Sequence, residues 1–363
     1  MAQVTGPATD PWAGFDGHEE VLIADDAASG LRAVIAIHST ALGPALGGVR
    51  MSTYSTYGSD AQAAAYADAL RLSRAMTYKN ALAGLDHGGG KAVIIHDSSH
   101  KPRELLHAFG ELVTSLHGRY VCAGDVGMNV ADMDTIGETC RWTTGRSPAN
   151  GGVGDSGILT AVGVHAGMRA GAQARWGSPD LGGLTVGVIG AGKVGGRLIG
   201  HLLDDGANVI ALDPSDAARH EVEQAHPGRV RWVTDVLALL DAGPDVLSPN
   251  ALGGLLTPEF SSLLADRGVG LVCGGANNQL ASPQVAELLQ RLGVLYAPDF
   301  CVNPGGVVQV AEELVGADVE RARAKVEKVF DTTTRVLARA ESEGITPVAA
   351  AEREAEDRIR LAG

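Results

Sequence analysis

Hydrophobic residues follow two different spacings along the chain, and the spacing changes from segment to segment. Residues 60–80 and 103–117 place apolar side chains three and four positions apart, which predicts helices. Residues 30–38 and 92–95 are short apolar runs rich in valine and isoleucine, which predicts strands. The first part of the chain is therefore expected to alternate strands and helices, as α/β domains do.

A second domain is expected after residues 144–154, which are dense in turn formers and lack apolar periodicity. From residue 184 the pattern predicts a strand, a glycine turn, a helix to Asp205 and a strand over 208–212. Further short apolar runs follow, so we predict a doubly wound parallel sheet with helices on both faces. We assign residues 1–145 to the first domain and 146–330 to the second. The amphipathic helices of residues 331–363 are expected to pack back on the first domain.

Composition narrows the class of protein. A chain of 363 residues with 45% hydrophobic and 20% charged residues is globular and long enough for two domains. The net charge of −14 argues against a nucleic-acid or anionic-membrane surface. The four cysteines lack metal-ligand spacing, and the N-terminus carries Asp10 and Asp16 without the apolar core of a signal peptide. We therefore expect reduced thiols, no membrane span and a cytoplasmic protein.

Two lysines lie twelve residues apart, with three glycines directly before the second. Glycines of this kind are retained where the backbone needs a positive φ or a close approach, so we interpret residues 88–90 as a loop beside a ligand. Lys79 would end a helix and Lys91 would open a strand, and both amines could then face one site. One could hold a carboxylate while the other, with a pKa lowered by burial, acts as a general base. The alternative is two surface lysines around a flexible turn.

The run Gly-Ala-Gly-Lys-Val-Gly at residues 190–195 matches the dinucleotide-binding pattern of a Rossmann domain. It follows a predicted strand and opens a helix, and Asp213 stands at the end of the next strand, where an acid that binds the ribose is expected. Gly190 would form the tight turn, Gly192 would admit the pyrophosphate and Gly195 would allow close packing of helix and strand. Because Asp213 would repel a 2′-phosphate, NAD is favoured over NADP. The alternative is a similar turn that binds no nucleotide.

Other polar residues follow predicted strands. Asp125 ends the run at residues 119–125 and could exchange protons with a reacting amine, although it could equally cap the next turn. Asn277 follows another strand and could orient a cofactor or an amine, or could simply form a turn. His87 and His165 lack partners at metal-ligand spacing, so no metal site is predicted. Two lysines, an aspartate and NAD together suggest oxidation of a primary amine to an imine, followed by hydrolysis.

Five segments resemble the glutamate/leucine/phenylalanine/valine dehydrogenase family. They are residues 43–48, 76–91, 131–134, 274–278 and 296–303, and they occur in the family's order. The resemblance implies a first domain that binds substrate, a Rossmann domain that binds NAD, and a homo-oligomer. It also implies NAD-dependent, reversible deamination of a branched-chain L-amino acid to a 2-oxo acid and ammonia. Phenylalanine as substrate, or a non-catalytic NAD-binding regulatory protein, are the alternatives.

The resemblance also assigns roles to individual residues. Lys79 and the backbone of Gly47 and Gly48 would bind the substrate carboxylate, Lys91 would activate water or amine, and Asp125 would shuttle protons. The cofactor would contact Gly190, Gly192, Lys193, Val194, Gly195, Asp213, Ala251, Thr160 and Asn277, the last of these also near the substrate amine. The side-chain pocket would be lined by Leu46, Ala123, Val307 and Val310. Met128, Asn250 and Pro304 depart from the family pattern, and Pro304 is expected to bias Asn303 towards an extended backbone.

Overall fold

The computed structural model describes residue 15 and residues 17–362, so Asp10 and Asp16 lie outside the described part of the chain. By their internal contacts these residues form two compact units. Residues up to 154 and residues 359–362 belong to the first, and residues 155–358 belong to the second. A short segment at residues 82–84 groups with the second unit. The boundary thus follows the glycine-rich stretch that the sequence indicated, at 154 rather than 145. No helix in the described residues is both long and apolar enough to traverse a bilayer.

The first unit is built on a mixed five-stranded sheet with the order β1-β2-β4-β3-β5. Its strands are β1 (Glu20–Asp26), β2 (Leu31–Ser39), β3 (Ala45–Ser52), β4 (Gly88–Ile95) and β5 (Tyr120–Gly124). The β1–β2 and β2–β4 pairs are antiparallel, whereas β3 runs parallel to both β4 and β5. Because β3, β4 and β5 point the same way, their carboxyl ends meet at one edge of the sheet.

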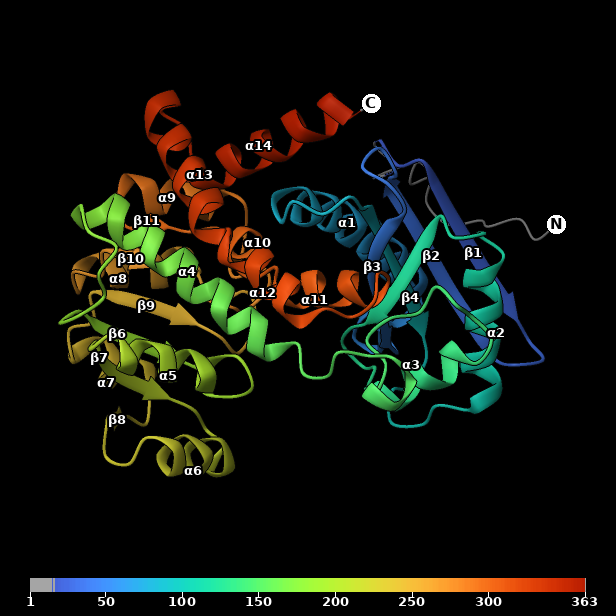
Figure 1. The fold of residues 1–363 in the computed structure, drawn as a ribbon, viewed down its shortest axis with the longest axis horizontal. Coiled ribbons are helices and arrows are strands. Elements are labelled where there is room, and N and C mark those ends of the chain that lie inside the picture. Colours follow the sequence, from blue (N-terminus) through green and yellow to red (C-terminus); the bar gives the residue numbers. More distant parts are fainter. Residues whose placement is uncertain (1–14, 16, 363) are drawn as a thin grey trace. The chain divides into compact units, whose positions relative to one another are not determined.

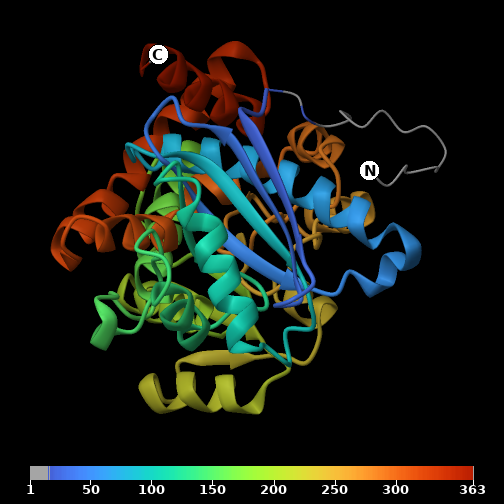
Figure 2. The ribbon, with the colours of Figure 1, turned by 90° about the vertical axis from the view of Figure 1, so that its right-hand side faces the viewer.

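Helices cover both faces of this sheet. On one face α1 (Ala61–Leu82) packs on Val34, Ala36 and Val93. On the other, α2 (Arg103–Thr114) and α3 (Val130–Gly137) bury residues such as Phe109 against the remaining inward side chains of the strands. Figure 2 shows α1 and α2 on opposite sides of the sheet. Successive side chains of β2 therefore pack alternately into the cores on the two faces of the sheet. This explains why the strand is apolar almost throughout.

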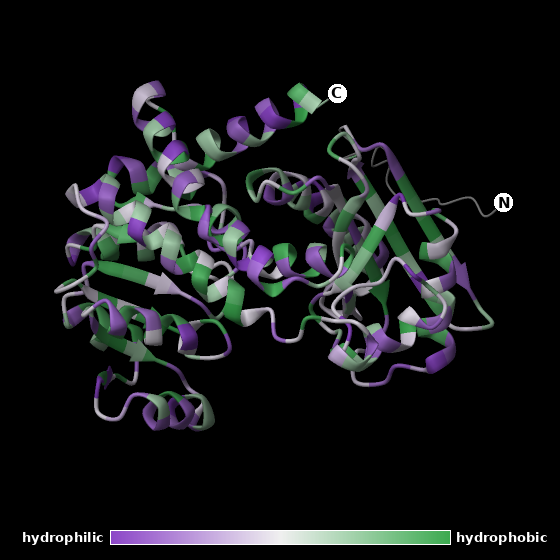
Figure 3. Cartoon of the chain, viewed as in Figure 1, coloured by the Kyte–Doolittle hydropathy of each residue, from purple (hydrophilic) through white to green (hydrophobic). Residues whose placement is uncertain are grey.

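The second unit contains a six-stranded, wholly parallel sheet with the order β11-β10-β9-β6-β7-β8. Its strands are β6 (Thr185–Ile189), β7 (Asn208–Leu212), β8 (Val230–Trp232), β9 (Val246–Pro249), β10 (Leu271–Val272) and β11 (Leu295–Tyr296). The order reverses between β6 and β9, which is the dinucleotide-binding arrangement that the sequence predicted. The strands at the centre of this sheet are hydrophobic (Figure 3).

In the second unit one helix precedes β6, further helices alternate with the strands up to β11, and the remaining helices follow β11 in succession. In chain order the helices are α4 (Gly157–Trp176), α5 (Gly195–Asp204), α6 (Asp216–Ala225), α7 (Val236–Asp241), α8 (Pro258–Asp266), α9 (Gln284–Arg291), α10 (Asp299–Val302), α11 (Gly305–Glu313), α12 (Val319–Glu327), α13 (Val329–Glu343) and α14 (Pro347–Ala362). In the first unit, short 3-10 helices lie at Ser55–Asp60 and Pro148–Asn150.

Helix α13 packs along α4 (Figure 1), and residues up to 358 group with the second unit. The contact with α4 is close, because a Cβ on Gly167 of α4 would lie 2.4 Å from Val302 of α10 and 3.6 Å from Thr333 of α13. Small residues on α4 let these helices approach closely, and an amphipathic pattern does not specify which partner it meets. Packing of these helices on the first domain stays a prediction.

Candidate active site

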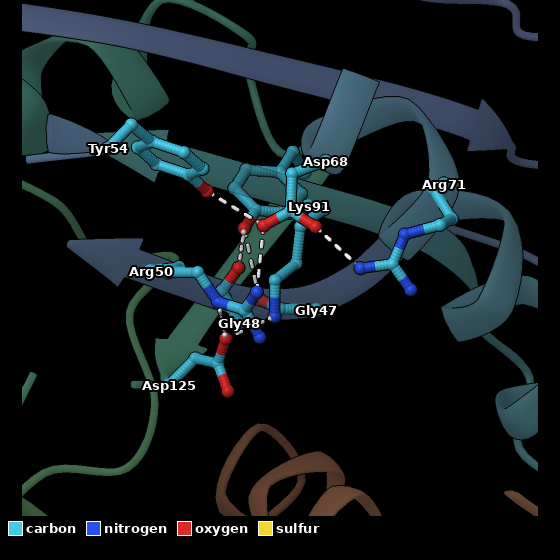
Figure 4. Close-up of polar contacts among 9 residues, drawn as sticks. Gly47, Gly48, Arg50, Tyr54, Asp68, Arg71, Lys91 and Asp125 are labelled. Carbon is cyan, nitrogen blue, oxygen red and sulfur yellow. Dashed lines mark hydrogen bonds and ion pairs between the residues drawn. The ribbon is translucent and has the colours of Figure 1, made fainter. Parts of the chain in front are cut away.

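Lys91 and Asp125 are in contact, as predicted for the proton-transfer pair. Lys91 lies within β4 and is 5% exposed, and its Nζ donates a hydrogen bond of 2.7 Å to Oδ2 of Asp125. Asp125 directly follows β5, and its backbone N–H donates to the carbonyl of Val49 in β3. The intervening strand contributes Gly48, where a Cβ would lie 2.8 Å from the Asp125 side chain and 3.1 Å from Lys91 Nζ. Figure 4 shows this arrangement.

The electrostatics of this pair suit proton transfer. Burial lowers the pKa of Lys91, and the neighbouring Arg50 guanidinium lowers it further, while Asp125 acts in the opposite direction. Burial would raise the pKa of Asp125, but Lys91 and Arg50 outweigh burial and hold this pKa below its ordinary value. An amine with a lowered pKa gives up its proton more readily than an exposed lysine, and the ionised carboxylate beside it can accept one.

Arg50 is a member of this cluster that the sequence analysis missed. Its Nε donates 3.1 Å to Oδ2 of Asp125, and its Nη1 donates 2.7 Å to Asp68 of α1. Asp68 also accepts from the hydroxyl of Tyr54 at 2.7 Å and from Arg71 at 2.6 Å. The signal was present in the alternation of β3, because Arg50 lies two residues after Gly48 and so projects from the same face of the strand.

The three glycines before Lys91 form part of β4 rather than a loop, which corrects the sequence-based interpretation. None of them has a positive φ, and each is needed because another part of the first unit lies too close for a side chain. A Cβ would lie 1.8 Å from the Ser39 carbonyl at Gly88, 2.1 Å from the Thr77 backbone at Gly89, and 2.6 Å from the Tyr120 ring at Gly90. The close approach that glycine permits is therefore to the protein itself.

Gly47 and Gly48 likewise belong to a strand, β3, and are buried or half-buried beside β4. A Cβ on Gly47 would lie 1.8 Å from the Gly90 carbonyl, so this position accepts no side chain. Their carbonyls accept hydrogen bonds from the hydroxyl of Tyr120, at 3.0 and 3.3 Å. Leu46 lies on β3 and Ala123 on the neighbouring strand β5, and both are buried.

Lys79 lies half-buried in the last turn of α1. The residue after it, Asn80, is fully buried and donates to the carbonyls of Leu46 (3.0 Å) and Gly88 (2.6 Å). These hydrogen bonds hold the end of α1 against β3 and β4, the strands that carry Gly47, Gly48 and Lys91. Convergence of the two amines on one site, and a role for Lys79 in binding a carboxylate, stay predictions.

The glycine turn of the second unit has the form that a dinucleotide requires. It connects β6 to α5, and Gly190 has a φ of +93°, which favours glycine. A Cβ on Gly195 would lie 1.8 Å from the Gly190 carbonyl, whereas a Cβ on Gly192 would meet nothing within 4 Å. Gly192 is thus not needed for internal packing, which fits a backbone that a ligand approaches.

Asp213 follows β7, and both of its oxygens accept backbone hydrogen bonds. Oδ2 accepts from Ala191 at 2.7 Å, and Oδ1 accepts from Ser215 at 2.7 Å. The carboxylate is therefore fixed beside the glycine turn, as an acid for the ribose hydroxyls would be. Ala251 is also adjacent, because a Cβ on Gly190 would lie 2.8 Å from the Ala251 Cβ. Lys193 is exposed and Val194 half-buried at the start of α5.

Side-chain hydrogen bonds of asparagines link the segments that follow the parallel strands at their carboxyl ends. Asn250 follows β9, and its side chain donates to Ser248 and accepts from Gly275 N at 2.9 Å. Asn303 donates to the Gly275 carbonyl and to Oδ1 of Asn277, both at 3.0 Å. The side chain of Asn277 is thus held by a neighbouring amide at this edge of the sheet, and its role as a ligand stays a prediction.

Thr160, Val307 and Val310 lie on two helices of the second unit that begin side by side. A Cβ on Gly305 would lie 2.2 Å from Thr160 N, and one on Gly306 would lie 3.7 Å from Thr160 Oγ1. Val307 is buried and Val310 half-buried on α11. Their roles as cofactor and pocket residues stay predictions.

Two of the departures from the family pattern have clear structural places. Asn303, before Pro304, has φ −109° and ψ +33°, which is not extended and so corrects the expectation. Its side-chain hydrogen bonds and the bond from its backbone N–H to the Asp299 carbonyl outweigh the steric bias of the proline. Met128 packs against the hydrophobic core of the first unit.

Within residues 15 and 17–362, no group of three or more His, Cys, Asp or Glu side chains has a metal-binding arrangement. His87 contacts the Pro44 carbonyl, and His165 pairs with Asp205 at 2.6 Å. The four cysteines, all in the described part, are buried free thiols.

Comparison with known proteins identifies the class to which this fold and these residues belong. Residues 18–142 match the description "Glu/Leu/Phe/Val dehydrogenase, dimerisation domain". Residues 216–362 match "Glutamate/Leucine/Phenylalanine/Valine dehydrogenase". The chain belongs to this family of amino-acid dehydrogenases.

Individual relatives match over nearly the whole chain. A valine dehydrogenase of Streptomyces virginiae is 55% identical over 345 residues, covering 94% of each chain. A leucine dehydrogenase of Bacillus subtilis is 42% identical over 343 residues, covering 94% of this chain and 91% of its own. Among solved structures, L-tryptophan dehydrogenase from Nostoc punctiforme superimposes with a TM-score of 0.82 at 36% identity, covering 95% of this chain and 97% of its own.

Proposed function

We propose that this protein catalyses the NAD-dependent, reversible oxidative deamination of a branched-chain L-amino acid. The amino acid, NAD⁺ and water give the 2-oxo acid, ammonium, NADH and one proton. The observation that carries the proposal is the buried contact between Lys91 and Asp125, at 2.7 Å, beside the backbone of Gly48. The valine and leucine dehydrogenases among the relatives support the substrate class.

The polar groups of the candidate site would divide the steps of this reaction between them. Lys79 and the backbone of Gly47 and Gly48 would hold the substrate carboxylate. Lys91, whose pKa burial lowers, would remove a proton from the water that attacks the imine carbon. Asp125 would accept a proton from the substrate ammonium before oxidation and return one to the departing amine. Lys91 would thus accept a proton in this direction and donate it in the reverse reaction, whereas Asp125 would both accept and donate one in each direction.

The second unit supplies a site that fits NAD. Gly190, Gly192 and Gly195 with the start of α5 would hold the pyrophosphate, and Lys193, Val194 and Ala251 border the same turn. When bound, NAD⁺ would accept the hydride from the substrate. Asp213 favours NAD because its carboxylate would receive ribose hydroxyls and repel a 2′-phosphate, and Pro214 and Ser215 offer no arginine. Thr160 and Asn277 would contact the nicotinamide or the amine.

The substrate side chain is the least determined part of the proposal. Leu46, Ala123, Val307 and Val310 are aliphatic, which suits valine, leucine or isoleucine. A methylene in an apolar pocket changes binding by only about 1–3 kcal/mol, so these residues do not rank the three substrates. Phenylalanine remains the second candidate, because the polar groups would handle it identically.

The direct test follows NADH formation from L-valine, L-leucine, L-phenylalanine and L-glutamate at 340 nm. We expect the branched-chain substrates to give the largest kcat/KM. A preference for phenylalanine would replace the substrate and keep the chemistry. No turnover on any amino acid would refute the enzyme and leave the regulatory alternative.

We also propose that the protein works as a homo-oligomer, since its first part matches a dimerisation domain. Light scattering coupled to size-exclusion chromatography measures the mass in solution, and a monomer would refute this. The cytoplasmic location stays a prediction from the sequence.

A further inference from the structure

We propose that Arg50, which Asp68 holds in place, is a positioning residue for Asp125. It keeps Oδ2 of Asp125 hydrogen-bonded to two cations, so that Oδ1 is left for proton exchange with the substrate. This inference rests on the proposed function for its kinetic consequences, but the geometry on which it stands belongs entirely to the first unit.

Two cationic donors meet the same carboxylate oxygen. Lys91 Nζ and Arg50 Nε donate to Oδ2 of Asp125 at 2.7 and 3.1 Å, from the adjacent strands β4 and β3. Two donors on one oxygen resist rotation of the carboxylate, so Oδ1 keeps a fixed direction. A proton-transfer group must hold its acceptor atom in place, because a displacement of about 1 Å can cost 100-fold in rate. Lys91 on its own would leave the carboxylate free to pivot.

Arg50 is itself fixed from its far side. Asp68 receives Arg50 Nη1 and the Tyr54 hydroxyl on Oδ2, both at 2.7 Å, and Arg71 on Oδ1 at 2.6 Å. The side chains of Arg50 and Asp68 are only 21% and 12% exposed. Arg50 therefore spans two carboxylates, one on α1 and one after β5, and its planar guanidinium sets the distance between them. Figure 4 shows these charged side chains, in which each contacts the next in the order Arg71, Asp68, Arg50, Asp125 and Lys91.

Arg50 also acts on the charge of Lys91. The guanidinium lowers the pKa of Lys91, whereas Asp68 and Asp125 raise it. Other groups near this cluster are Tyr54, the backbone of Val126, and Tyr120, whose own pKa is raised by burial and by Cys122 and Asp125. Removal of the Arg50 charge should thus favour the Lys91 ammonium, and removal of the Asp68 charge should favour the neutral amine. Opposed shifts would show that the charges of Arg50 and Asp68 reach the Lys91 amine, whereas charges screened by solvent would leave its pKa unchanged.

The experiment compares Arg50→Met, Arg50→Lys and Asp68→Asn with wild type and with Arg32→Met. Arg32 is a matched control, because it is 48% exposed on β2 and lies 3.9 Å from Asp25, away from the cluster. The first measurement is the pH titration of the Lys91 amine by ¹⁵N NMR of the whole protein, with the signal assigned by Lys91→Ala. We expect an upward shift of the midpoint in Arg50→Met, a downward shift in Asp68→Asn and none in Arg32→Met.

The second measurement is kcat and KM on the preferred amino acid over a pH series. Arg50→Met should lower kcat by about 10- to 100-fold with a much smaller change in KM, and should move the acid limb of kcat/KM to higher pH. Arg50→Lys keeps the charge and loses the two-sided contact, so it should retain most of the pH profile while kcat stays low. Wild-type kcat and titration in both Arg50 variants would overturn the proposal.

If Arg50→Met does not fold, as judged by circular dichroism, the nearly isosteric Asp68→Asn carries the test, and an unshifted Lys91 midpoint there overturns the inference. If the wild type turns over no amino acid, the proposed function fails, whereas the inference is then judged by the opposed NMR shifts. An unchanged midpoint in every variant rejects it whatever the activity.

Discussion

At the scale of single residues, the amine of Lys91 is costly to charge because it is buried. Taking a charge out of water is unfavourable by several kcal/mol unless a partner compensates, and Asp125 is that partner. Burial lowers the pKa of Lys91 and so favours loss of its proton, although Asp125 acts against this; a lowered pKa is the property that a general base needs. Arg50 reduces the charge that Asp125 offers to Lys91, and so favours this loss further.

Lys91→Ala should abolish amino-acid turnover while NAD binding is retained. General bases contribute about 10²- to 10⁴-fold, and no other amine contacts Asp125 in the described residues. Steady-state assays measure the turnover, and quenching of NADH fluorescence measures the binding. The exposed Lys328→Ala serves as the control for loss of a lysine. Full activity of the Lys91 variant would contradict the mechanism.

Asp213→Ala should relax the preference for NAD over NADP, because it removes the charge that would repel a 2′-phosphate. The same change deletes hydrogen bonds from Ala191 and Ser215, so a loss of about 1–3 kcal/mol in stability is expected as well. The ratio of kcat/KM for the two cofactors measures the first effect, and urea unfolding measures the second. An unchanged ratio would remove Asp213 from the ribose site.

The sequence predicted Lys91, Asp125 and the glycine turn because each is marked by local context, namely a strand end or a flanking glycine. Arg50 was missed since its importance comes from Asp125 and Asp68, which are 75 and 18 residues away in sequence. Contacts of that kind depend on strand order, and strand order in a mixed sheet does not follow from periodicity. Asn303 was misjudged because its tertiary hydrogen bonds prevailed over a local steric preference.

At the scale of elements, the sequence specified the parallel sheet better than the mixed one. Strands β6 and β7 were predicted to within a residue, since each is a short apolar run bounded by glycine or aspartate. Strand β8 was missed because it has only three residues, one of them an exposed arginine. Strands β3 and β4 contain glycines that resemble loops by composition, and only the close approach of their neighbours explains them.

The glycine turn offers a matched pair of substitutions. Gly195→Ala should destabilise the second unit by about 1–3 kcal/mol, because its Cβ would lie 1.8 Å from the Gly190 carbonyl. Gly192→Ala should leave the melting temperature near that of wild type, because its Cβ would meet no atom within 4 Å, yet it should weaken NAD binding. Thermal unfolding and NADH fluorescence separate the two effects. Unaltered NAD affinity in Gly192→Ala would argue against a cofactor at this turn.

At the scale of the whole molecule, stability should depend on pH through His38. Burial lowers the pKa of His38 from 6.5 to about 4, with smaller contributions from His18 and Arg74 and an opposing one from Glu19. The ring packs edge-on against His18 at 4.9 Å, and its Nδ1 contacts Thr77 Oγ1 at 2.9 Å. The folded protein therefore favours the neutral imidazole more strongly than the unfolded chain does.

Because the folded state binds fewer protons than the unfolded state between pH 6.5 and 4, its stability should fall as the pH is lowered through this range. Above pH 6.5 the contribution is fully present. His38→Gln should flatten this part of the pH profile, whereas His100→Gln, at an exposed position, should not. Urea midpoints measured at intervals across the range provide the test, and parallel profiles for His38→Gln and wild type would exclude His38 as the cause.

The glycine contacts of β3 and β4 limit how this enzyme could be redesigned. At Gly47, Gly88 and Gly89 the obstructing atoms are main chain, so no compensating mutation in a neighbour can create room there. Libraries intended to change the accepted amino acid should leave these three codons untouched. Variation belongs instead at the aliphatic positions proposed for the side-chain pocket, such as Ala123 and Val310.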